Sequence, residues 1–383
     1  MRNYLYDSHC VCGHVTRFTP HTMQDGLYPG VKVSEWRLIG PNLASLIVHL
    51  HLRFRLSVSK NQEFLREVIG IPLSVGVLQQ CYEEAAVSAV PLEDKLVDDL
   101  LADTLSEVSA VDSASGGENS PPAELPVSPS STGAAAILHM DETPWYEHGK
   151  LLWLWVFITQ HTVCYWIGHR TSAILKLALG LHFYGWIMSD GYATYRSFPN
   201  RLRCWAHLIR KAKGLIECLN PAGQTFGLQV SELMGALKDD IVEWRKLYPD
   251  QHFRTEEIAN KFRDRLEQFH QRCLINAQSG HKKTAELAKE FLNDWEAIFR
   301  VIFYPAFPMT NNEAERALRH WVLYRRFSYG TKSETGSRSL ALLASVIDTC
   351  RLRRASSLTY MASVIRAART GKTHPPLPAR VGV

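Results

Sequence analysis

The apolar positions that follow residue 136 are grouped first as strands and then as helices. Three runs rich in β-branched and aromatic residues are separated by short polar breaks, which is typical of adjacent strands. These runs cover residues 136–143, 151–160 and 162–169. A helical pattern over residues 172–181 and another apolar run over residues 184–190 follow. The pattern therefore predicts an α/β domain in which a helix separates the third strand from the fourth.

A longer helical stretch, rich in charged residues, comes after these strands. Between residues 215 and 299 apolar side chains recur at helical spacing, as at Ile258, Phe262 and Leu266. The preceding order of strand, strand, strand, helix and strand is the order with which a ribonuclease-H-like fold begins. We therefore expect a ribonuclease-H-like α/β core that is interrupted by a helical insertion. The expected segments are 136–214 for the first part of the core, 215–305 for the insertion and 306–352 for the final helix of the core.

Residues 106–135 divide the chain into two parts. This segment holds no aromatic residue and no Lys or Arg, and Ser, Pro, Gly and Ala dominate it. Such a composition cannot bury enough apolar surface to offset the entropy of ordering, so we expect a disordered linker. Residues 31–105 are expected to form a small all-α domain, and residues 353–383 a basic C-terminal tail.

Two short helical patterns before the linker indicate a helix-turn-helix. They cover residues 61–69 and 74–86 and follow a more apolar helical pattern over residues 42–57. The turn between them contains Gly70, and Ser74 is placed as an N-cap. Two short helices joined by a tight turn suit a DNA-reading module. A plain helical hairpin is the alternative, because the second helix is poor in Arg and Lys.

Composition and charge restrict the class of protein. The chain has 383 residues, of which 46% are hydrophobic, so two or three folded domains are expected. The formal net charge of +5 permits a polyanionic partner, and the basic residues are clustered. Residues 201–213 and residues 316–332 each hold five Arg or Lys and no acid. These clusters favour nucleic acid as the partner.

Cysteine usage and hydropathy indicate a cytoplasmic protein. The eight cysteines are scattered apart from Cys10 and Cys12, which is not the pattern of a disulfide framework. The N-terminus lacks the apolar core of a signal peptide. The longest apolar run, near residues 151–158, is far shorter than the ~20 residues of a membrane span. We therefore expect no membrane partner.

Three acidic residues stand at informative points of this pattern. Asp141 and Asp190 end apolar strand runs, and Glu315 opens a basic helix. In α/β sheets ligands gather at the carboxyl ends of strands. Mg²⁺ prefers a few carboxylates together with substrate phosphates, and two such ions can activate a water and stabilise a leaving oxygen on phosphate. The three acids therefore predict an enzyme that cuts and joins nucleic-acid strands.

Two neighbouring acids compete for places in this site. Side chains alternate along a strand, so Asp141 and Glu142 point to opposite faces, and we place Asp141 in the shared metal site. On a helix Glu313 lies about 200° from Glu315, so one of these two must be a bystander. Position alone leaves the choice between Glu313 and Glu315 open.

Four motifs follow one another along the chain with characteristic gaps. They are Asp141-Glu142-Thr143-Pro144-Trp145, Ser189-Asp190-Gly191-Tyr192-Ala193-x-Tyr195, Cys204-Trp205-Ala206-His207-Leu208-x-Arg210-Lys211 and Thr310-Asn311-Asn312-x-Ala314-Glu315-Arg316-x-Leu318-Arg319. Together they resemble the bacterial insertion sequence 66 transposase family. The resemblance implies a DDE transposase with a ribonuclease-H-like core and two Mg²⁺ ions, for which Mn²⁺ can substitute. It implies that Asp141, Asp190 and Glu315 are the catalytic triad, and the Ala-Glu-Arg context selects Glu315 over Glu313.

The resemblance also implies partners. One partner is DNA, both as the terminal inverted repeats of a mobile element and as the target. The protein is expected to form a homo-oligomer on DNA and to act with accessory proteins of the same element. Its expected location is the nucleoid-associated cytoplasm. The expected contacts to the DNA backbone are Arg316, Arg319, Arg325, Arg326 and Lys211. Two rival interpretations are a nuclease of the same fold without strand transfer, and an inactive or truncated transposase that only binds DNA.

Cysteine and histidine residues give two further expectations. Cys204 and His207 match a Cys-x-x-His element of the family, which could supply half a zinc site, but no second pair is near in sequence. Together with Asn312 they are expected to be structural residues near the site. Cys10 and Cys12 resemble the second half of a zinc-binding module whose first half is missing. Residues 1–30 are therefore interpreted as a remnant of that module, with Zn²⁺ binding left open.

Overall fold

The structure is a computed structural model that describes residues 39–105, 137–180, 183–249 and 254–380, with two short strands near the N-terminus. These strands, β1 (Ser8–His9) and β2 (Val15–Thr16), pair antiparallel. Contacts divide the chain into two compact units, Met1–Lys95 with Ser333–Val383, and Leu96–Lys332. The expected zinc ligands Cys10 and Cys12 and the expected linker 106–135 lie outside the described residues.

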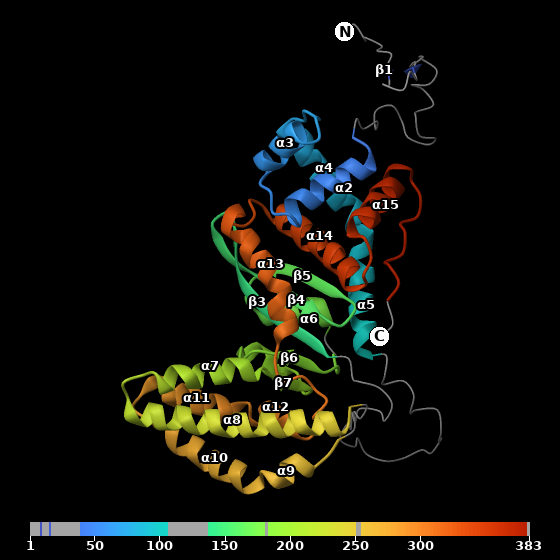
Figure 1. Ribbon diagram of the computed structural model, residues 1–383. Helices are drawn as coiled ribbons and strands as arrows, with labels where there is room; N and C mark the ends of the chain where they lie inside the picture. Colours follow the sequence, from blue (N-terminus) through green and yellow to red (C-terminus); the bar gives the residue numbers. More distant parts are fainter. Residues whose placement is uncertain are drawn as a thin grey trace, which may run out of the picture. The chain divides into compact units, whose positions relative to one another are not determined.

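The helices of the first unit come from both ends of the chain (Figure 1). They are α2 (Pro41–Leu52), α3 (Val58–Glu67), α4 (Val75–Ala89), the 3-10 helix η2 (Val90–Leu92), α14 (Glu334–Leu352) and α15 (Ser357–Arg369). α2 packs against α4 and α15, and α14 packs against α4. The helix α5 (Glu93–Leu105) begins in this unit and ends in the other.

The helix pair α3 and α4 is present where the sequence predicts it. Gly70 in the connecting turn has φ of +77°, a conformation that other residues rarely adopt. Ser74 caps α4, since its Oγ accepts a hydrogen bond from the Val77 N–H at 3.3 Å. α4 contains no Arg or Lys, so this helix has no cationic side chain with which to contact DNA.

Two segment boundaries expected from the sequence differ in the structure. Residues 306–352 were expected to form one piece of the core, but α13 (Asn312–Ser328) belongs to the second unit and α14 to the first. Residues 353–383 are more than a basic tail, because α15 packs against α2 and α4. Arg369 of α15 also forms a two-pronged ion pair with Glu84 of α4. Helical periodicity shows that a face is buried but does not identify the partner that buries it.

The second unit contains a five-stranded mixed sheet in the order β5-β4-β3-β6-β7. The strands are β3 (Leu138–Glu147), β4 (Lys150–Ile158), β5 (Val163–Gly168), β6 (Ile187–Ser189) and β7 (Arg201–Arg203). β4 pairs antiparallel with both β3 and β5, whereas β6 pairs in parallel with β3 and β7 in parallel with β6. The expected α/β class is confirmed.

β3 runs past Pro144, where the sequence predicts that the strand has already ended. Proline cannot donate a backbone hydrogen bond, so it is normally excluded from central strands. β3 is central only at Leu138 and His139, where it pairs with β6. Beyond them its strand partner is β4, with Pro144 opposite Trp153, until Glu147 at its end forms a bridge to Thr331. One edge of the strand is therefore free at Pro144, and the strand continues.

Helices make up the rest of the second unit. They are α6 (Ser172–Leu179), the 3-10 helix η3 (Ala193–Ser197), α7 (Trp205–Ile216), α8 (Pro221–Leu247), α9 (Glu257–Lys261), α10 (Arg263–Asn276), α11 (Lys282–Asn293), α12 (Trp295–Phe299), the 3-10 helix η4 (Arg300–Ile302) and α13. The expected insertion is helical, and one apolar core joins it to the sheet, as shown by Met188 of β6, Trp205 of α7 and Phe291 of α11. The insertion is thus packed onto β6 and β7, the strands before and after Asp190.

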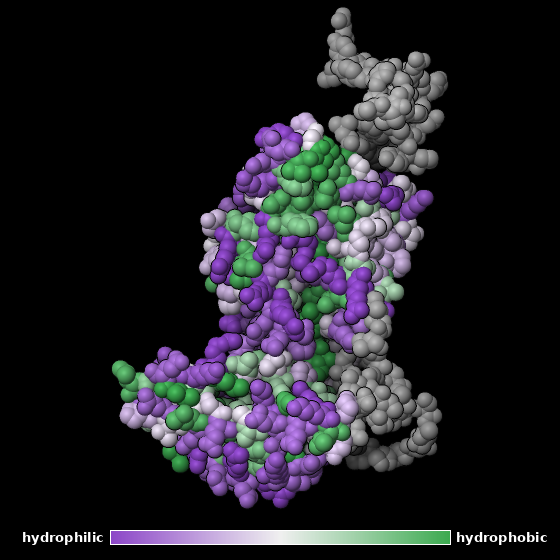
Figure 2. All heavy atoms as spheres, viewed as in Figure 1, coloured by the Kyte–Doolittle hydropathy of each residue, from purple (hydrophilic) through white to green (hydrophobic). Residues whose placement is uncertain are grey.

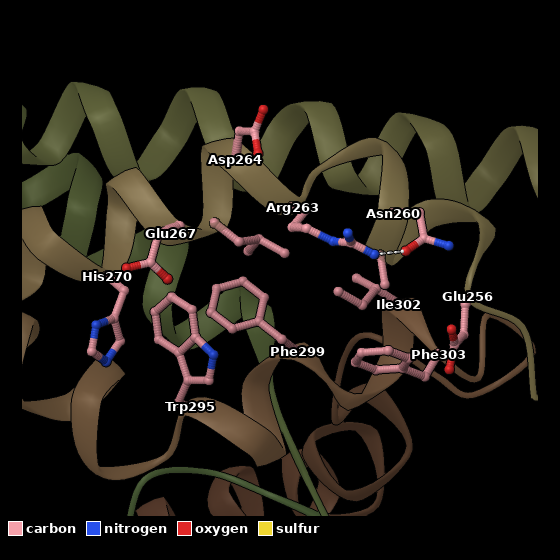
Figure 3. Close-up of a pocket in the computed structure, with 12 residues that line it drawn as sticks. Glu256, Asn260, Arg263, Asp264, Glu267, His270, Trp295, Phe299, Ile302 and Phe303 are labelled. Atoms are coloured by element: carbon pink, nitrogen blue, oxygen red, sulfur yellow. Dashed lines mark hydrogen bonds between the residues drawn. The ribbon is translucent and has the colours of Figure 1, made fainter.

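A cavity of about 730 Å³ lies within the insertion (Figure 3). Its wall combines aromatic side chains, such as Trp295 and Phe299, with charged ones, such as Arg263 and Glu267. The ring of His270 meets that of Trp295 edge to face, with centroids 4.8 Å apart. None of the expected site residues lines this cavity.

The surface of the first unit carries apolar residues around α2 and α4 (Figure 2). On α4 the side chains of Val75 and Val87 are exposed.

Among the described residues, none of the helices combines the length and the hydropathy that crossing a bilayer requires.

Candidate active site

Asp141 lies inside β3, at the point where this strand separates from β6. The parallel pairing of the two strands ends at His139, so β6 no longer covers the free edge of β3 at Asp141. The Asp141 Oδ1 accepts a hydrogen bond from the Glu142 N–H at 2.9 Å. Asp141 does not end the strand, as the sequence suggested, but it does stand where the parallel part of the sheet ends.

Asp190 follows directly after β6. Its Oδ1 accepts a hydrogen bond from the Tyr192 N–H at 2.8 Å, an Asx turn that directs the chain away from the sheet. The carbonyl of the preceding Ser189 accepts a hydrogen bond from the Cys204 N–H at 3.0 Å. The turn that carries Asp190 is therefore connected to the start of α7.

Asn311 fixes the beginning of α13, the helix that carries Glu315. Its Nδ2 donates to the Met140 carbonyl at 2.7 Å, and its Oδ1 accepts from the His139 Nδ1 at 3.0 Å. Its backbone N–H donates to the Cys204 Sγ at 3.2 Å. Asn311 is fully buried, whereas Asn312, the residue expected to be structural, is exposed. The structure thus gives the buried position to the first asparagine of the pair.

The other end of α13 is fixed to β3 as well. Gly330 has φ of +100°, and a Cβ there would lie 1.9 Å from the Tyr146 carbonyl oxygen, so only glycine fits. The Thr331 N–H donates to that carbonyl at 2.9 Å, and the Trp145 Nε1 donates to the Thr331 Oγ1 at 3.1 Å. α13 is therefore held along β3 at both ends, which places Glu315 beside Asp141.

The structure brings Asp141, Asp190 and Glu315 into one cluster. The pKa of Asp141 is raised to about 8, first by burial and then by the negative charges of Glu142, Asp190 and Glu315. The Glu315 Oε1 is buried and has no hydrogen-bond partner among the described residues. Carboxylates that repel one another, one of which has a buried oxygen without a donor, are suited to a hard divalent cation. The residues present therefore fit the expected Mg²⁺.

Glu142 contacts residues around Asp190, although strand alternation predicts that its side chain points away from Asp141. It is buried, and its carboxylate accepts hydrogen bonds from the Arg170 Nη2 at 2.6 Å and from the Tyr195 hydroxyl at 2.5 Å. Burial and the charge of Asp190 raise the pKa of Glu142. The Arg170 guanidinium also lies 4.1 Å from the centre of the Tyr192 ring.

These contacts explain why two tyrosines accompany Asp190 in its motif. Tyr192 and Tyr195 belong to the motif that contains Asp190, and both are fastened to β3 through Arg170 or Glu142. Glu142 thus fixes the loop after Asp190 and does not act as a bystander. The two tyrosines, placed two and five residues after Asp190, were the sequence signal from which the link between Glu142 and this loop could have been predicted.

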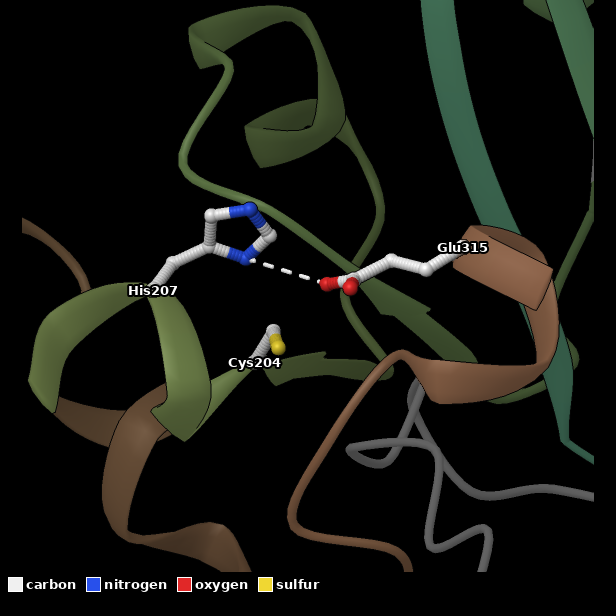
Figure 4. A group of neighbouring side chains, drawn as sticks. All are labelled: Cys204, His207 and Glu315. Atoms are coloured by element: carbon white, nitrogen blue, oxygen red, sulfur yellow. Dashed lines mark ion pairs between the residues drawn. The ribbon is translucent and has the colours of Figure 1, made fainter. Parts of the chain in front are cut away.

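Cys204 and His207 lie next to Glu315 (Figure 4). The His207 Nδ1 and the Glu315 Oε1 are 3.9 Å apart, and a sulfur, a nitrogen and an oxygen of the three side chains all lie within 4.8 Å of one another. Burial lowers the pKa of His207, and the charges of Asp190 and Glu315 oppose that effect. The Cys-x-x-His element is thus in direct proximity to the third acid.

The basic residues of α13 fall into two groups. Arg319 and Arg326 are exposed and follow Glu315 at four and eleven residues, which places them on the same side of the helix. Arg316 is paired with Glu313, and the Arg325 Nη1 donates to the Thr143 Oγ1 at 3.3 Å. Arg319 and Arg326 are therefore the cations of α13 best placed to contact a substrate at Glu315.

Lys211 is part of an ion-pair cluster with the insertion. Its Nζ lies 2.5 Å from the Glu290 Oε2 of α11. Arg203 of β7, whose side chain is fully buried, pairs with the same glutamate and lies 3.0 Å from Asp294. A Cβ on Gly191 would lie 2.6 Å from the Glu290 Oε1 and 2.7 Å from the Arg203 Nη2. The glycine after Asp190 thus packs directly on this pair.

Comparison with known protein families identifies the chain. The model of the family described as "Transposase IS66 family" matches residues 131–339, more than half of the sequence. The chain belongs to the IS66 transposase family. The matched region contains all three acids, the insertion and α13, so the membership covers the whole candidate site of this IS66 family protein.

One curated relative is the "Uncharacterized protein y4qI" of Sinorhizobium fredii (strain NBRC 101917 / NGR234). It is 24% identical over 205 residues, which cover 48% of this chain and 36% of the relative. The aligned region therefore spans about a third of the length of the relative.

Proposed function

We propose that this IS66 family protein is a DDE transposase that cleaves DNA at the ends of a mobile element and joins them to a target. The observation that supports this most directly is the cluster of Asp141, Asp190 and Glu315, which come from two strands and a helix far apart in sequence. Family membership independently favours a DNA-processing enzyme.

The proposed core is ribonuclease-H-like. In support, the sheet begins with three antiparallel strands and continues with two parallel strands on the other side of the first. The two aspartates lie on or after the two central parallel strands, β3 and β6. This is the edge at which ligands gather in α/β sheets.

In the proposed reaction, Asp141, Asp190 and Glu315 hold two Mg²⁺ ions. When bound, such ions supply water activation and stabilisation of the leaving oxygen on phosphate. Cleavage leaves a 3′-hydroxyl at the element end, and that hydroxyl then displaces an oxygen of the target phosphodiester. Arg319 and Arg326 orient the DNA backbone beside Glu315.

The other polar residues of the site keep the acids in place. Asn311 holds the first turn of α13 against β3, which fixes the position of Glu315. Glu142, through Tyr195 and Arg170, holds the loop that follows Asp190. These groups position the reacting site without touching the phosphate.

A cleavage assay on DNA that carries the element end tests this proposal. The wild-type protein should cut the DNA with Mg²⁺ and not without it, and Asp190→Asn should abolish cutting while DNA binding stays close to wild type. Asp239→Asn, the same change at an exposed position of α8, is the matched control and should cut normally. Metal-dependent cutting by Asp190→Asn would contradict the mechanism.

A joining assay separates this proposal from its rivals. With paired element ends and a supercoiled target, a transposase gives joined products, whereas a nuclease of the same fold gives only cut ends. A protein that binds DNA without cutting it under either condition is a non-catalytic relative, and the proposal then fails at its first step.

A further inference from the structure

Cys204, His207 and Glu315 form a compact set of metal-ligating atoms that the proposed Mg²⁺ chemistry does not fully use. The sulfur, one ring nitrogen and one carboxylate oxygen lie within 4.8 Å of one another. Figure 4 shows the imidazole and the carboxylate facing each other, with the thiol beside the gap between them. The His207 Nδ1 and the Glu315 Oε1 are buried, and neither has a hydrogen-bond partner among the described residues.

The distance between His207 and Glu315 is informative. At 3.9 Å the two atoms are too far apart for a direct hydrogen bond, which is rarely longer than about 3.2 Å. Nitrogen and oxygen ligands of a tetrahedral zinc ion, each at about 2.0–2.1 Å from the metal, are roughly 3.3 Å apart. A shift of about half an ångström therefore brings the His207 and Glu315 atoms to the separation of two zinc ligands.

The backbone holds these three residues in place. The Cys204 N–H donates to the Ser189 carbonyl at 3.0 Å, and the Trp205 N–H donates to the Met309 carbonyl at 2.9 Å. The Asn311 N–H donates to the Cys204 Sγ at 3.2 Å, and this hydrogen bond opposes burial, the main cause of the raised pKa of the thiol. The ends of β6, α7 and α13 are thus connected around the ligand atoms before any metal binds.

We propose that Cys204, His207 and Glu315 bind a Zn²⁺ ion, with a water as the fourth ligand. Cys204 binds as the thiolate and releases its proton to solvent. Thiolate and imidazole suit Zn²⁺, whereas Mg²⁺ requires oxygen ligands and octahedral geometry. The two metals therefore prefer different ligand sets that share Glu315.

Sharing of Glu315 gives the zinc site a regulatory consequence, and this part rests on the proposed function. Glu315 cannot complete the carboxylate cluster with Asp141 and Asp190 while it is bound to Zn²⁺ beside His207. Zn²⁺ at about one equivalent should therefore inhibit cleavage in the presence of excess Mg²⁺.

Co²⁺ titration of the full-length protein tests the site directly, because a cobalt–thiolate bond gives a strong near-ultraviolet charge-transfer band. The wild type should show this band at one equivalent. Cys204→Ser should lose it, whereas Cys218→Ser should keep it as the matched control. The Cys10→Ser/Cys12→Ser variant excludes the N-terminal cysteines and should also keep the band.

His207→Gln guards against a folding artefact, because this side chain is partly exposed and its loss leaves the core intact. Zn²⁺ affinity, measured by competition with Co²⁺, should fall more than about 100-fold, beyond the usual effect of changing a residue that only supports a ligand. An unchanged affinity, or a Co²⁺ band that survives in Cys204→Ser, overturns the proposal. If no condition gives DNA cleavage, the proposed function fails while the Co²⁺ result still decides the zinc site.

Discussion

At the scale of single residues, the buried carboxyl group of Asp141 lowers the stability of the folded protein. Its pKa is raised from 3.8 to about 8 in the folded protein, so the unfolded chain releases the proton at lower pH. The free energy of unfolding of the metal-free protein therefore falls as pH rises between these values, and the loss is complete above pH 8. Asp141→Asn, which resembles the protonated acid, should remove this loss.

The predicted gain for Asp141→Asn at pH 7 is about 1–2 kcal/mol, which is roughly 2–8 °C in Tm for a unit of this size. Thermal unfolding in EDTA measures it, and cleavage should be lost in the same variant. Mg²⁺ should raise the Tm of the wild type and have little effect on the variant. A variant that is less stable than the wild type in EDTA would show that Asp141 is not strained by its neighbours.

The basic residues of α13 allow a second prediction at this scale. Arg319 and Arg326 are exposed on the side of Glu315, whereas Arg316 is already paired with Glu313. The double change Arg319→Gln/Arg326→Gln should therefore weaken DNA binding and reduce the slope of log K against log salt by about 2, since each phosphate contact contributes about 0.9. Arg316→Gln should change the slope by less than half of that. Equal effects of the double and the single variant would reject this assignment.

At the scale of elements, the sequence predicts the strands β3 to β6 and misses β7. β4 and β5 are recognisable because β-branched and aromatic residues run through them. β7 has arginine at both ends, and both arginines are buried because Asp294, about 90 residues later, pairs with them, as Glu290 does with Arg203. A pattern of apolar positions cannot reveal such a strand.

The same limit applies to the candidate site. Strand ends and motifs were enough to select Asp141, Asp190 and Glu315, which the structure brings together. The residues that hold them were not predictable, because Asn311 acts through Met140, 171 residues away. The role of Glu142 was not predictable for a similar reason, since its contact with Tyr195 depends on the fold and not on strand alternation.

The turn after Asp190 gives a prediction about the contact between the sheet and the insertion. Gly191→Ala places a methyl group where Glu290 and the buried Arg203 already meet, so the turn or the ion pair must shift. We expect a loss of stability of about 1–3 kcal/mol and a fall in kcat for cleavage, because Asp190 moves with the turn.

A matched glycine provides the control. A Cβ on Gly235 in α8 meets nothing within 4 Å, so Gly235→Ala should raise stability by up to about 1 kcal/mol and leave cleavage unchanged. Normal kcat in Gly191→Ala, together with normal stability, would mean that the turn does not depend on its contact with the insertion.

At the scale of the whole molecule, the first unit is built from two segments that are far apart in sequence. α2 and α4 come from the N-terminal part, and α14 and α15 come from the C-terminal part. α2 alone could not bury its apolar residues, because α15 and α4 supply the surfaces that cover it. The C-terminal helix is therefore needed for the stability of helices that precede the second unit in the chain.

Ile365→Ala tests this dependence. Ile365 is fully buried in α15, so its truncation should cost about 2–5 kcal/mol and should increase amide hydrogen exchange in α2, although the two helices are more than 300 residues apart in sequence. Leu358→Ala, at a position of α15 that is 39% exposed, should leave exchange in α2 nearly unchanged. Exchange in β3 and β4 should stay at the wild-type level in both variants, because these strands have their own core in the second unit. Loss of protection in β3 and β4 together with α2 would show instead that the two units unfold as one.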